Sequence, residues 1–305
     1  MPFHLPSISR REFIVRTLAG GAGALAIRNG LAAGPETDPD LWALYSDSHI
    51  AASTAKVWRD EPMYDNARRV NREMLGMRRH PCGMIHFGDC AFKEGLAEEY
   101  GTFRSTISPI QQSGIPIHLM VGNHDARETF WNSLKAETSG PRPVASRHVA
   151  IVEHARANWF LLDSLDQTDK SPGLVGSEQR AWLAKELDAR KDKPALVCVH
   201  HPPLVGSKAD SDSGIKDTQA LLDVIVPRRQ VKALVFGHTH RWKLAMLGDL
   251  HLVSLPAIGY PSKDGAPTGW VACWLHDDGM RVVLSSRDTS HKDHFRPIEL
   301  AWRSA

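Results

Sequence analysis

Short apolar runs alternate with clusters of His, Asp, Asn and Gly along most of the chain. Five runs have this form, at residues 41–46, 82–87, 115–121, 195–199 and 232–236. Each run has the length of a strand and is followed by polar turn residues, as is typical of the buried strands of an α/β sheet. Polar residues just past the carboxyl ends of such strands converge on one crevice. The pattern therefore predicts a single site built from five loops.

Other segments predict two helices and two β-hairpins. Residues 177–190 and 217–226 have the apolar spacing and polar starts of helices. The hairpins are expected to pair residues 147–155 with 158–164 and residues 269–276 with 280–286.

No repeat, low-complexity run or Pro/Gly/Ser-rich linker divides the chain beyond its N-terminal segment. We therefore predict one domain over residues 34–305. Its core is expected at about residues 41–288, followed by a C-terminal tail at residues 289–305.

The first 33 residues have the order of an export signal. A basic segment containing Arg10 and Arg11 precedes an uncharged apolar stretch at residues 18–27, and Ala32 and Ala33 follow. The letters SRREFI around the two arginines resemble the twin-arginine motif. We therefore predict a cleaved twin-arginine signal peptide, the Tat export machinery as a partner of the precursor, and a periplasmic or secreted mature protein. The alternative is a basic N-terminus leading into a short helix.

The apolar stretch is too short to span a bilayer, so no stable membrane anchor is expected. The chain of 305 residues has a formal charge of +2, and 42% of its residues are hydrophobic, as in ordinary globular proteins. Removing residues 1–32 takes away four arginines and one glutamate and changes the charge to −1. This excludes the basic excess of a general nucleic-acid-binding protein, so no nucleic acid partner is expected. The oligomeric state stays open, a homo-oligomer included.

Four cysteines are too few for a disulfide scaffold, and no Cys-x-x-Cys pair indicates a structural zinc site. A disulfide between Cys82 and Cys90 stays open for an exported protein. Sixteen histidines are the unusual count, and His86 and His118, which lie inside predicted strands, are expected to pack or to form hydrogen bonds.

Polar clusters follow the five predicted strands. In chain order they are Asp47-Ser48-His49, Gly88-Asp89, Gly122-Asn123-His124-Asp125, His200-His201-Pro202-Pro203 and Gly237-His238-Thr239-His240. Their carboxylate, imidazole and amide groups suit Mn, Fe, Co or Zn. The alternating pairs in the first and last clusters would each share one face of an extended backbone. The glycines permit sharp turns and close backbone approach.

This ordered series resembles the calcineurin-like metallophosphoesterases over about residues 41–288. The resemblance implies a four-layer αββα sandwich of two mixed β-sheets flanked by helices, with a dinuclear metal site at the carboxyl ends of strands. It also implies seven metal ligands: Asp47, His49 and His240 at the first metal, Asn123, His200 and His238 at the second, and Asp89 bridging both. Within the family, the first, third and fourth clusters and the compact size look most like the branch that holds bacterial cyclic-nucleotide and glycerophosphodiester phosphodiesterases.

The family implies a hydrolase that acts on phosphoric ester bonds, and we expect its substrate to be a small phosphodiester. Two divalent ions and two carboxylates leave about two positive charges uncancelled, which favours a phosphate ester. A metal-bridging hydroxide is expected to attack phosphorus, because such sites lower the pKa of bound water toward about 7. His124 would be both catalytic and substrate-binding, Asp125 would orient His124 or its loop, and His201 would line the pocket beside His200.

Other interpretations remain open at this stage. A phosphomonoesterase would use the same two ions, which are Mn, Fe, Zn or Co, and a non-catalytic metal- or phosphate-binding module would keep the ligands without turnover. A nuclease would need basic residues around the site, and none cluster there. Taken singly, each polar residue could also be a turn or cap residue. Their order over nearly 200 residues favours a functional site.

Overall fold

The computed structural model describes residues 4–5, 35–134, 142–206, 213–262 and 265–304. Most of the predicted signal peptide at residues 1–33 lies outside the described residues. Within the described part of the chain, every helix is too short or too polar to cross a membrane.

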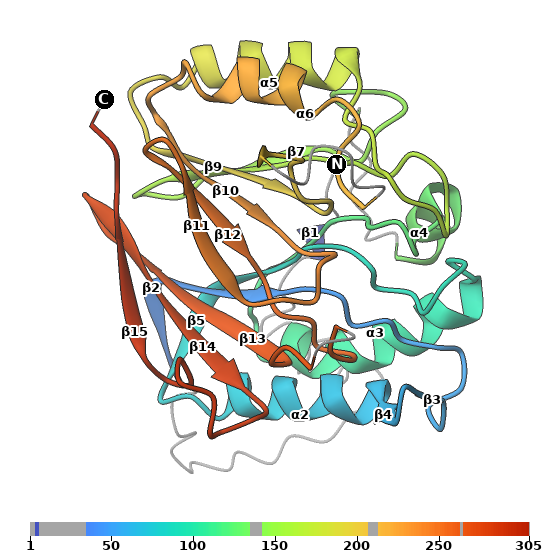
Figure 1. Ribbon diagram of the computed structural model, residues 1–305. Coiled ribbons are helices and arrows are strands. Elements are labelled where there is room, and N and C mark those ends of the chain that lie inside the picture. Colours follow the sequence, from blue (N-terminus) through green and yellow to red (C-terminus); the bar gives the residue numbers. More distant parts are fainter. Residues whose placement is uncertain (1–3, 6–34, 135–141, 207–212, 263–264, 305) are drawn as a thin grey trace, which may run out of the picture.

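Two mixed β-sheets pack against each other, and helices cover both outer faces (Figure 1). The seven-stranded sheet has the order β1 (His4–Leu5), β6 (Ile117–Leu119), β5 (Arg79–His86), β2 (Glu36–Tyr45), β13 (Gly269–Leu275), β14 (Gly279–Ser286), β15 (Pro297–Ala301). The six-stranded sheet has the order β11 (Lys243–Leu247), β12 (Leu250–Ser254), β10 (Val231–Phe236), β9 (Ala195–Val199), β8 (Asn158–Leu161), β7 (Ala150–Val152). A separate short hairpin pairs β3 (Val57–Trp58) with β4 (Glu61–Pro62).

The helices complete a four-layer arrangement, as predicted. Helices α5 (Ser177–Asp188) and α6 (Thr218–Ile225) cover the six-stranded sheet, and α2 (Met63–Leu75) and α3 (Ala97–Gln112) cover the seven-stranded sheet (Figure 1). Helix α4 (Arg127–Ser133) follows β6.

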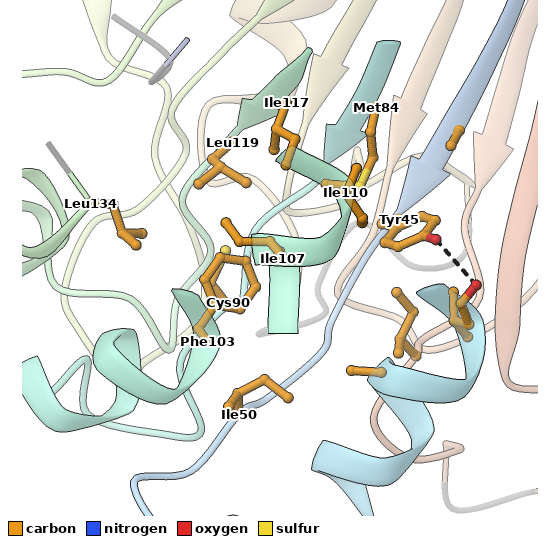
Figure 2. Close-up of a cluster of buried hydrophobic side chains, with 14 of the residues drawn as sticks. Tyr45, Ile50, Met84, Cys90, Phe103, Ile107, Ile110, Ile117, Leu119 and Leu134 are labelled. Carbon is orange, nitrogen blue, oxygen red and sulfur yellow. Dashed lines mark hydrogen bonds between the residues drawn. The ribbon is translucent and has the colours of Figure 1, made fainter. Parts of the chain in front are cut away.

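Alternation along β2 shows how one strand serves two cores. Trp42 and Leu44 pack between the two sheets, whereas Leu41, Ala43 and Tyr45 face α2 and α3. Successive side chains of a strand point to opposite faces, so a continuous apolar run is what a strand buried on both sides requires. The Tyr45 hydroxyl donates a hydrogen bond to a backbone carbonyl of α2 at 3.4 Å (Figure 2).

The five predicted strands, both predicted helices and both predicted hairpins are confirmed, with bounds that differ by a few residues. Within the predicted tail at residues 289–305, β15 pairs antiparallel with β14 and extends the seven-stranded sheet. Past β15, Arg303 is only 7% exposed and donates to the carbonyl of Val231 at 2.7 Å. The tail is therefore part of the packed structure.

A disulfide between Cys82 and Cys90 is not formed, since both are free thiols. Cys82 lies within β5, four residues before its end at His86, and Cys90 lies beyond that end. Four strand residues span about 13 Å, so Cys82 is already that far from the end of the strand. A disulfide needs Cα atoms within about 7 Å. Cys90 instead packs beside Phe103 and Ile107 of α3 (Figure 2).

Candidate metal centre

The polar clusters meet because the strands that precede them run parallel. Strands β2, β5 and β6 are parallel neighbours in one sheet, and β9 and β10 are parallel neighbours in the other. Their carboxyl ends therefore lie at the same edge of each sheet. Backbone hydrogen bonds join the loops in pairs, from Asp47 N to Gly88 O at 3.1 Å and from Gly237 N to His200 O at 3.1 Å. Across the two sheets, His238 N donates to the Asp47 carboxylate at 3.0 Å.

Left-handed backbone conformations are concentrated in this loop cluster. Five candidate ligands have positive φ: Asp47 (53°), His49 (48°), Asp89 (54°), His238 (62°) and His240 (51°). Such conformations cost about 1–3 kcal/mol each in a residue other than glycine and gather at functional sites. They also correct one sequence argument, because neither alternating pair lies on extended backbone. The side chains converge through a left-handed turn at each residue, not through the pleat of a strand.

Two glycines allow the loops to approach closely, as expected. A Cβ atom on Gly122 would overlap the Asp89 carboxylate, and one on Gly237 would overlap Ser46 and lie 2.7 Å from Asp47 Oδ2. Side chains at these positions would therefore push candidate ligands out of place.

The structure brings all seven predicted ligands together. Three groups each have ligand atoms within 4.8 Å of one another: Asp47, His49 and His240; Asp89, His200 and His238; His49, Asp89 and His124. Asn123 joins the second group, with its Oδ1 3.2 Å from His200 Nε2. Asp47, His49, Asp89 and His200 are at most 1% exposed.

Backbone carbonyls set the tautomer of three histidines. The contacts are His49 Nδ1 to Phe92 O (3.2 Å), His200 Nδ1 to Phe87 O (2.7 Å) and His240 Nδ1 to Tyr260 O (2.8 Å). A carbonyl oxygen only accepts, so each Nδ1 carries the hydrogen and Nε2, the nitrogen that has the lone pair when the ring is neutral, faces the cluster. Metal-binding histidines are commonly oriented in this way.

These lone pairs face other acceptors. His49 Nε2 and His240 Nε2 lie 3.0 Å apart, and His240 Nε2 lies 3.3 Å from Asp47 Oδ1. Buried acceptors that face one another are unfavourable unless a cation lies between them. The donor set therefore fits divalent metal ions, and its imidazole, carboxylate and amide groups suit borderline transition metals.

The pKa values of His200 and Asp89 also indicate that this cluster attracts positive charge. Burial opposes a charge on His200, but the carboxylates of Asp89 and Asp47 outweigh it and raise the pKa of His200 to about 9. Burial also opposes ionisation of Asp89, yet His200 and His124 hold the pKa of Asp89 well below its usual range. Without a metal ion, the carboxylates thus stay ionised and favour a proton on His200, which an ion bound at Nε2 would displace.

Asp125 lies behind the site and holds the loops. Its carboxylate accepts hydrogen bonds from the backbone N–H of Gly122 (2.8 Å), Ala91 (3.1 Å) and Cys90 (3.3 Å), and from the Tyr100 hydroxyl (3.1 Å). Burial and the nearby Asp89 raise the pKa of Asp125 to about 6. Of the two expected roles, orienting His124 or orienting its loop, these contacts favour the second.

His201 is fully buried, although we expected it to line a substrate pocket. Its Nδ1 lies 2.7 Å from the Ser164 hydroxyl, and its ring packs against the His238 ring with centroids 4.6 Å apart. His201 therefore packs against the candidate ligand His238 on the side away from solvent. His86 is also buried, and its Nε2 lies 3.1 Å from the Ser48 hydroxyl, in keeping with the hydrogen-bonding role expected of it.

The loop after β8 also reaches the site, although its sequence was interpreted only as part of a hairpin. Asp169 in this loop lies 3.1 Å from His124 Nδ1, and Ser171 lies 3.3 Å from His238 Nε2. A signal was available, because residues 163–171, which are polar except for Leu165, follow a buried strand just as the other clusters do. We interpreted this strand only as a hairpin arm, whereas it is also parallel to β9, which brings its carboxyl end to the site.

Comparison with known proteins agrees with this geometry. Residues 43–242 match the calcineurin-like phosphoesterase family. The chain is 28% identical over 264 residues to the 3',5'-cyclic adenosine monophosphate phosphodiesterase CpdA of Pseudomonas aeruginosa, covering 83% of this chain and 92% of that protein. It is 27% identical over 234 residues to the glycerophosphodiester phosphodiesterase GpdQ of Enterobacter lignolyticus, covering 74% and 82% respectively.

A solved structure shares the fold. A dimetal phosphatase from Danio rerio superposes with a TM-score of 0.65 at 14% identity, covering 87% of this chain and all of that one. The family match and the metal-binding geometry together lead to one conclusion: the chain belongs to the calcineurin-like phosphoesterase family and is a hydrolase that acts on phosphoric ester bonds.

Proposed function

We propose that this protein is a metal-dependent phosphodiesterase that hydrolyses a small phosphodiester. The observation that carries the proposal is the buried set of acceptors at the strand ends, in which His49, His240 and Asp47 turn their lone pairs toward one another. In the proposed assignment, Asp47, His49 and His240 hold one divalent ion, Asn123, His200 and His238 hold a second, and Asp89 bridges both.

When bound, two such ions activate water as a nucleophile and neutralise charge on the phosphate oxygens. The residues of the chain supply the rest. Asp89 Oδ1 accepts a hydrogen bond from the backbone N–H of His124 at 2.7 Å, which ties the His124 turn to the bridging carboxylate. His124 keeps 20% of its side chain exposed and offers a ring nitrogen within 4.8 Å of the ligand atoms of His49 and Asp89. It is therefore placed to contact a phosphate ester and to donate a proton to the departing oxygen.

Charge balance favours a diester over a monoester. A diester carries one negative charge and a monoester carries up to two near neutral pH, so a monoester needs more free positive charge around the site. Two nearby basic side chains are already engaged, since Arg127 makes a two-pronged contact with Asp163 and Lys93 lies 3.7 Å from Asp169. The curated relatives named above are phosphodiesterases, which supports the same choice.

Paired substrates test the proposal. We would load the metal-free protein with Mn, Fe, Co or Zn, count bound ions, and compare bis(p-nitrophenyl) phosphate with p-nitrophenyl phosphate. We expect metal-dependent turnover with a higher kcat/KM for the diester. A higher value for the monoester would assign a phosphatase instead. Two bound ions without turnover of either ester would assign a non-catalytic metal- or phosphate-binding module.

We also propose that the precursor is exported by the twin-arginine pathway. The support is the order of basic, apolar and small residues before Ala33. A reporter fused after residue 40 should reach the periplasm, and exchanging Arg10 and Arg11 for lysine should retain it in the cytoplasm. Unchanged location of the exchanged fusion would overturn this proposal.

A further inference from the structure

His124 has an acidic partner that the sequence motifs do not contain. Its Nδ1 lies 3.1 Å from the carbonyl oxygen of Lys93 and 3.1 Å from Oδ1 of Asp169. Both neighbours accept hydrogen bonds, so Nδ1 carries the hydrogen and Nε2 is the ring nitrogen left for substrate.

Several contacts hold Asp169 in place. Its backbone has a left-handed φ of 59°, and its N–H donates to the carbonyl of Asn123 at 2.6 Å. The preceding Thr168 hydroxyl donates to the carbonyl of Asp125 at 3.0 Å. The loop after β8 is thus docked on the same turn that carries His124. Strain of this kind persists only where the surrounding structure determines it, and it is typical of functional positions.

We propose that Asp169 is a positioning residue that orients the His124 ring so that Nε2 faces the leaving group of the substrate. The inference rests on the proposed phosphodiesterase function. A carboxylate that accepts the Nδ1–H holds the imidazole ring in one orientation, with Nε2 turned toward the substrate.

The step balances as follows. An oxygen from water forms a bond to phosphorus, and the bond from phosphorus to the leaving oxygen breaks with its electron pair on that oxygen. The proton of His124 Nε2 moves to the leaving oxygen, which departs as an alcohol. His124 then regains a proton from solvent, into which the attacking water has released one.

This arrangement indicates a substrate class. An aryl oxide leaves readily without a proton, whereas an alkoxide is too basic to do so and gains most from a general acid. Asp169 and His124 therefore suit diesters whose leaving group is an aliphatic alcohol, such as a sugar or polyol hydroxyl.

The test compares leaving groups in Asp169→Asn and Asp169→Ala. On a dialkyl diester such as glycerophosphoethanolamine, we expect kcat to fall about 100-fold, as for loss of general acid catalysis. On bis(p-nitrophenyl) phosphate, kcat should stay within about threefold of wild type, because no proton is needed. Bound metal should stay unchanged.

Asp166→Asn is the matched control, since Asp166 lies in the same loop but pairs with Lys216 at 2.6 Å. It should leave the ratio of the two rates unchanged. An equal fall on both esters, a loss of bound metal, or an unchanged ratio in the Asp169 variants would overturn the inference. Wild-type protein that binds two ions and hydrolyses neither ester would instead overturn the proposed function itself.

Discussion

Asp163 on one side and Asp47 and Asp89 on the other are buried carboxylates that lie past strand ends, and they differ in the side chains that surround them. Asp163, which follows β8, is fully buried and accepts hydrogen bonds from Arg127 Nε at 2.6 Å and from the backbone N–H of His148 and Leu165 at 2.9 Å each. A second contact from Arg127 Nη2, at 2.9 Å, completes a two-pronged ion pair. Every partner is a donor from the chain.

Asp47 and Asp89 are buried to the same degree and also accept backbone N–H bonds, but within the described residues their ion-pair partners are histidines and not an arginine or lysine. A buried charge is stable only when it is paired and hydrogen-bonded. The protein pairs Asp163 by itself, so that carboxylate is structural. Asp47 and Asp89 are instead available to bind a metal ion. The lack of an arginine or lysine partner among the described residues therefore identifies the site more clearly than burial or residue type does.

Loss of the bridging carboxylate should have the largest effect. Asp89→Ala should lower turnover at least about 10³-fold, toward the uncatalysed rate, because it removes the group expected to hold both ions. Metal analysis should show fewer than two ions per chain. Retention of both ions and of activity would contradict the assignment.

Removal of Arg127, the arginine that pairs with Asp163, should affect folding stability and not turnover. Arg127→Ala removes the two-pronged partner of the buried Asp163, leaves only Arg147 at 4.0 Å among the described residues, and should reduce the free energy of unfolding by about 3 kcal/mol. Urea denaturation measures this change. The folded fraction should keep its bound metal and its kcat, and a loss of metal in folded protein would show that the two groups are coupled.

Substitution of His124 distinguishes a metal ligand from a proton donor, because His124 lies beside the ligands but keeps part of its side chain exposed. His124→Ala should reduce turnover of a dialkyl diester about 100-fold, because a general acid is lost. Metal content should stay at two ions per chain. Loss of an ion would show that His124 is a metal ligand and not the proton donor.

An exposed cation at the rim should matter least. The Arg59 guanidinium lies over the Tyr260 ring, 5.1 Å from its centroid, and this ring packs against His49 and His240. Arg59→Ala should raise KM for an anionic diester by about threefold, as for a solvent-exposed charge, and leave kcat unchanged. Steady-state kinetics at low and high salt would check this, and a change in kcat would give Arg59 a closer role.

Sequence patterns predicted the central strands because these are buried on both faces and therefore read as continuous apolar runs. Helix α3 escaped prediction although Tyr100, Phe103, Ile107 and Ile110 have helical spacing, because Gly101 and Pro109 lie inside it. The hairpin of β11 and β12 was also missed, since β11 has no fully buried residue.

Within the candidate site, the polar clusters could be predicted because each follows its strand directly in the sequence. The loop after β8 carried the same signal, but nothing in it singles out Asp169, whose importance depends on a contact with His124, 45 positions earlier. The same holds for the carbonyls of Phe92, Phe87 and Tyr260, since every residue has a carbonyl and only packing decides which one meets a histidine.

By itself, the sequence determined the family, the order of the strands along the chain and the residue types available for chemistry, because these depend on local periodicity and on motifs read in line. Tertiary structure decided which nitrogen of His49, His200 and His240 faces the cluster. It also decided that the pairs around Ser48 and Thr239 converge through left-handed turns, and that the Asp169 carboxylate, not that of Asp125, contacts the His124 ring. Orientation and protonation depend on neighbours brought together from distant parts of the chain. Those neighbours exist only once the two sheets have packed.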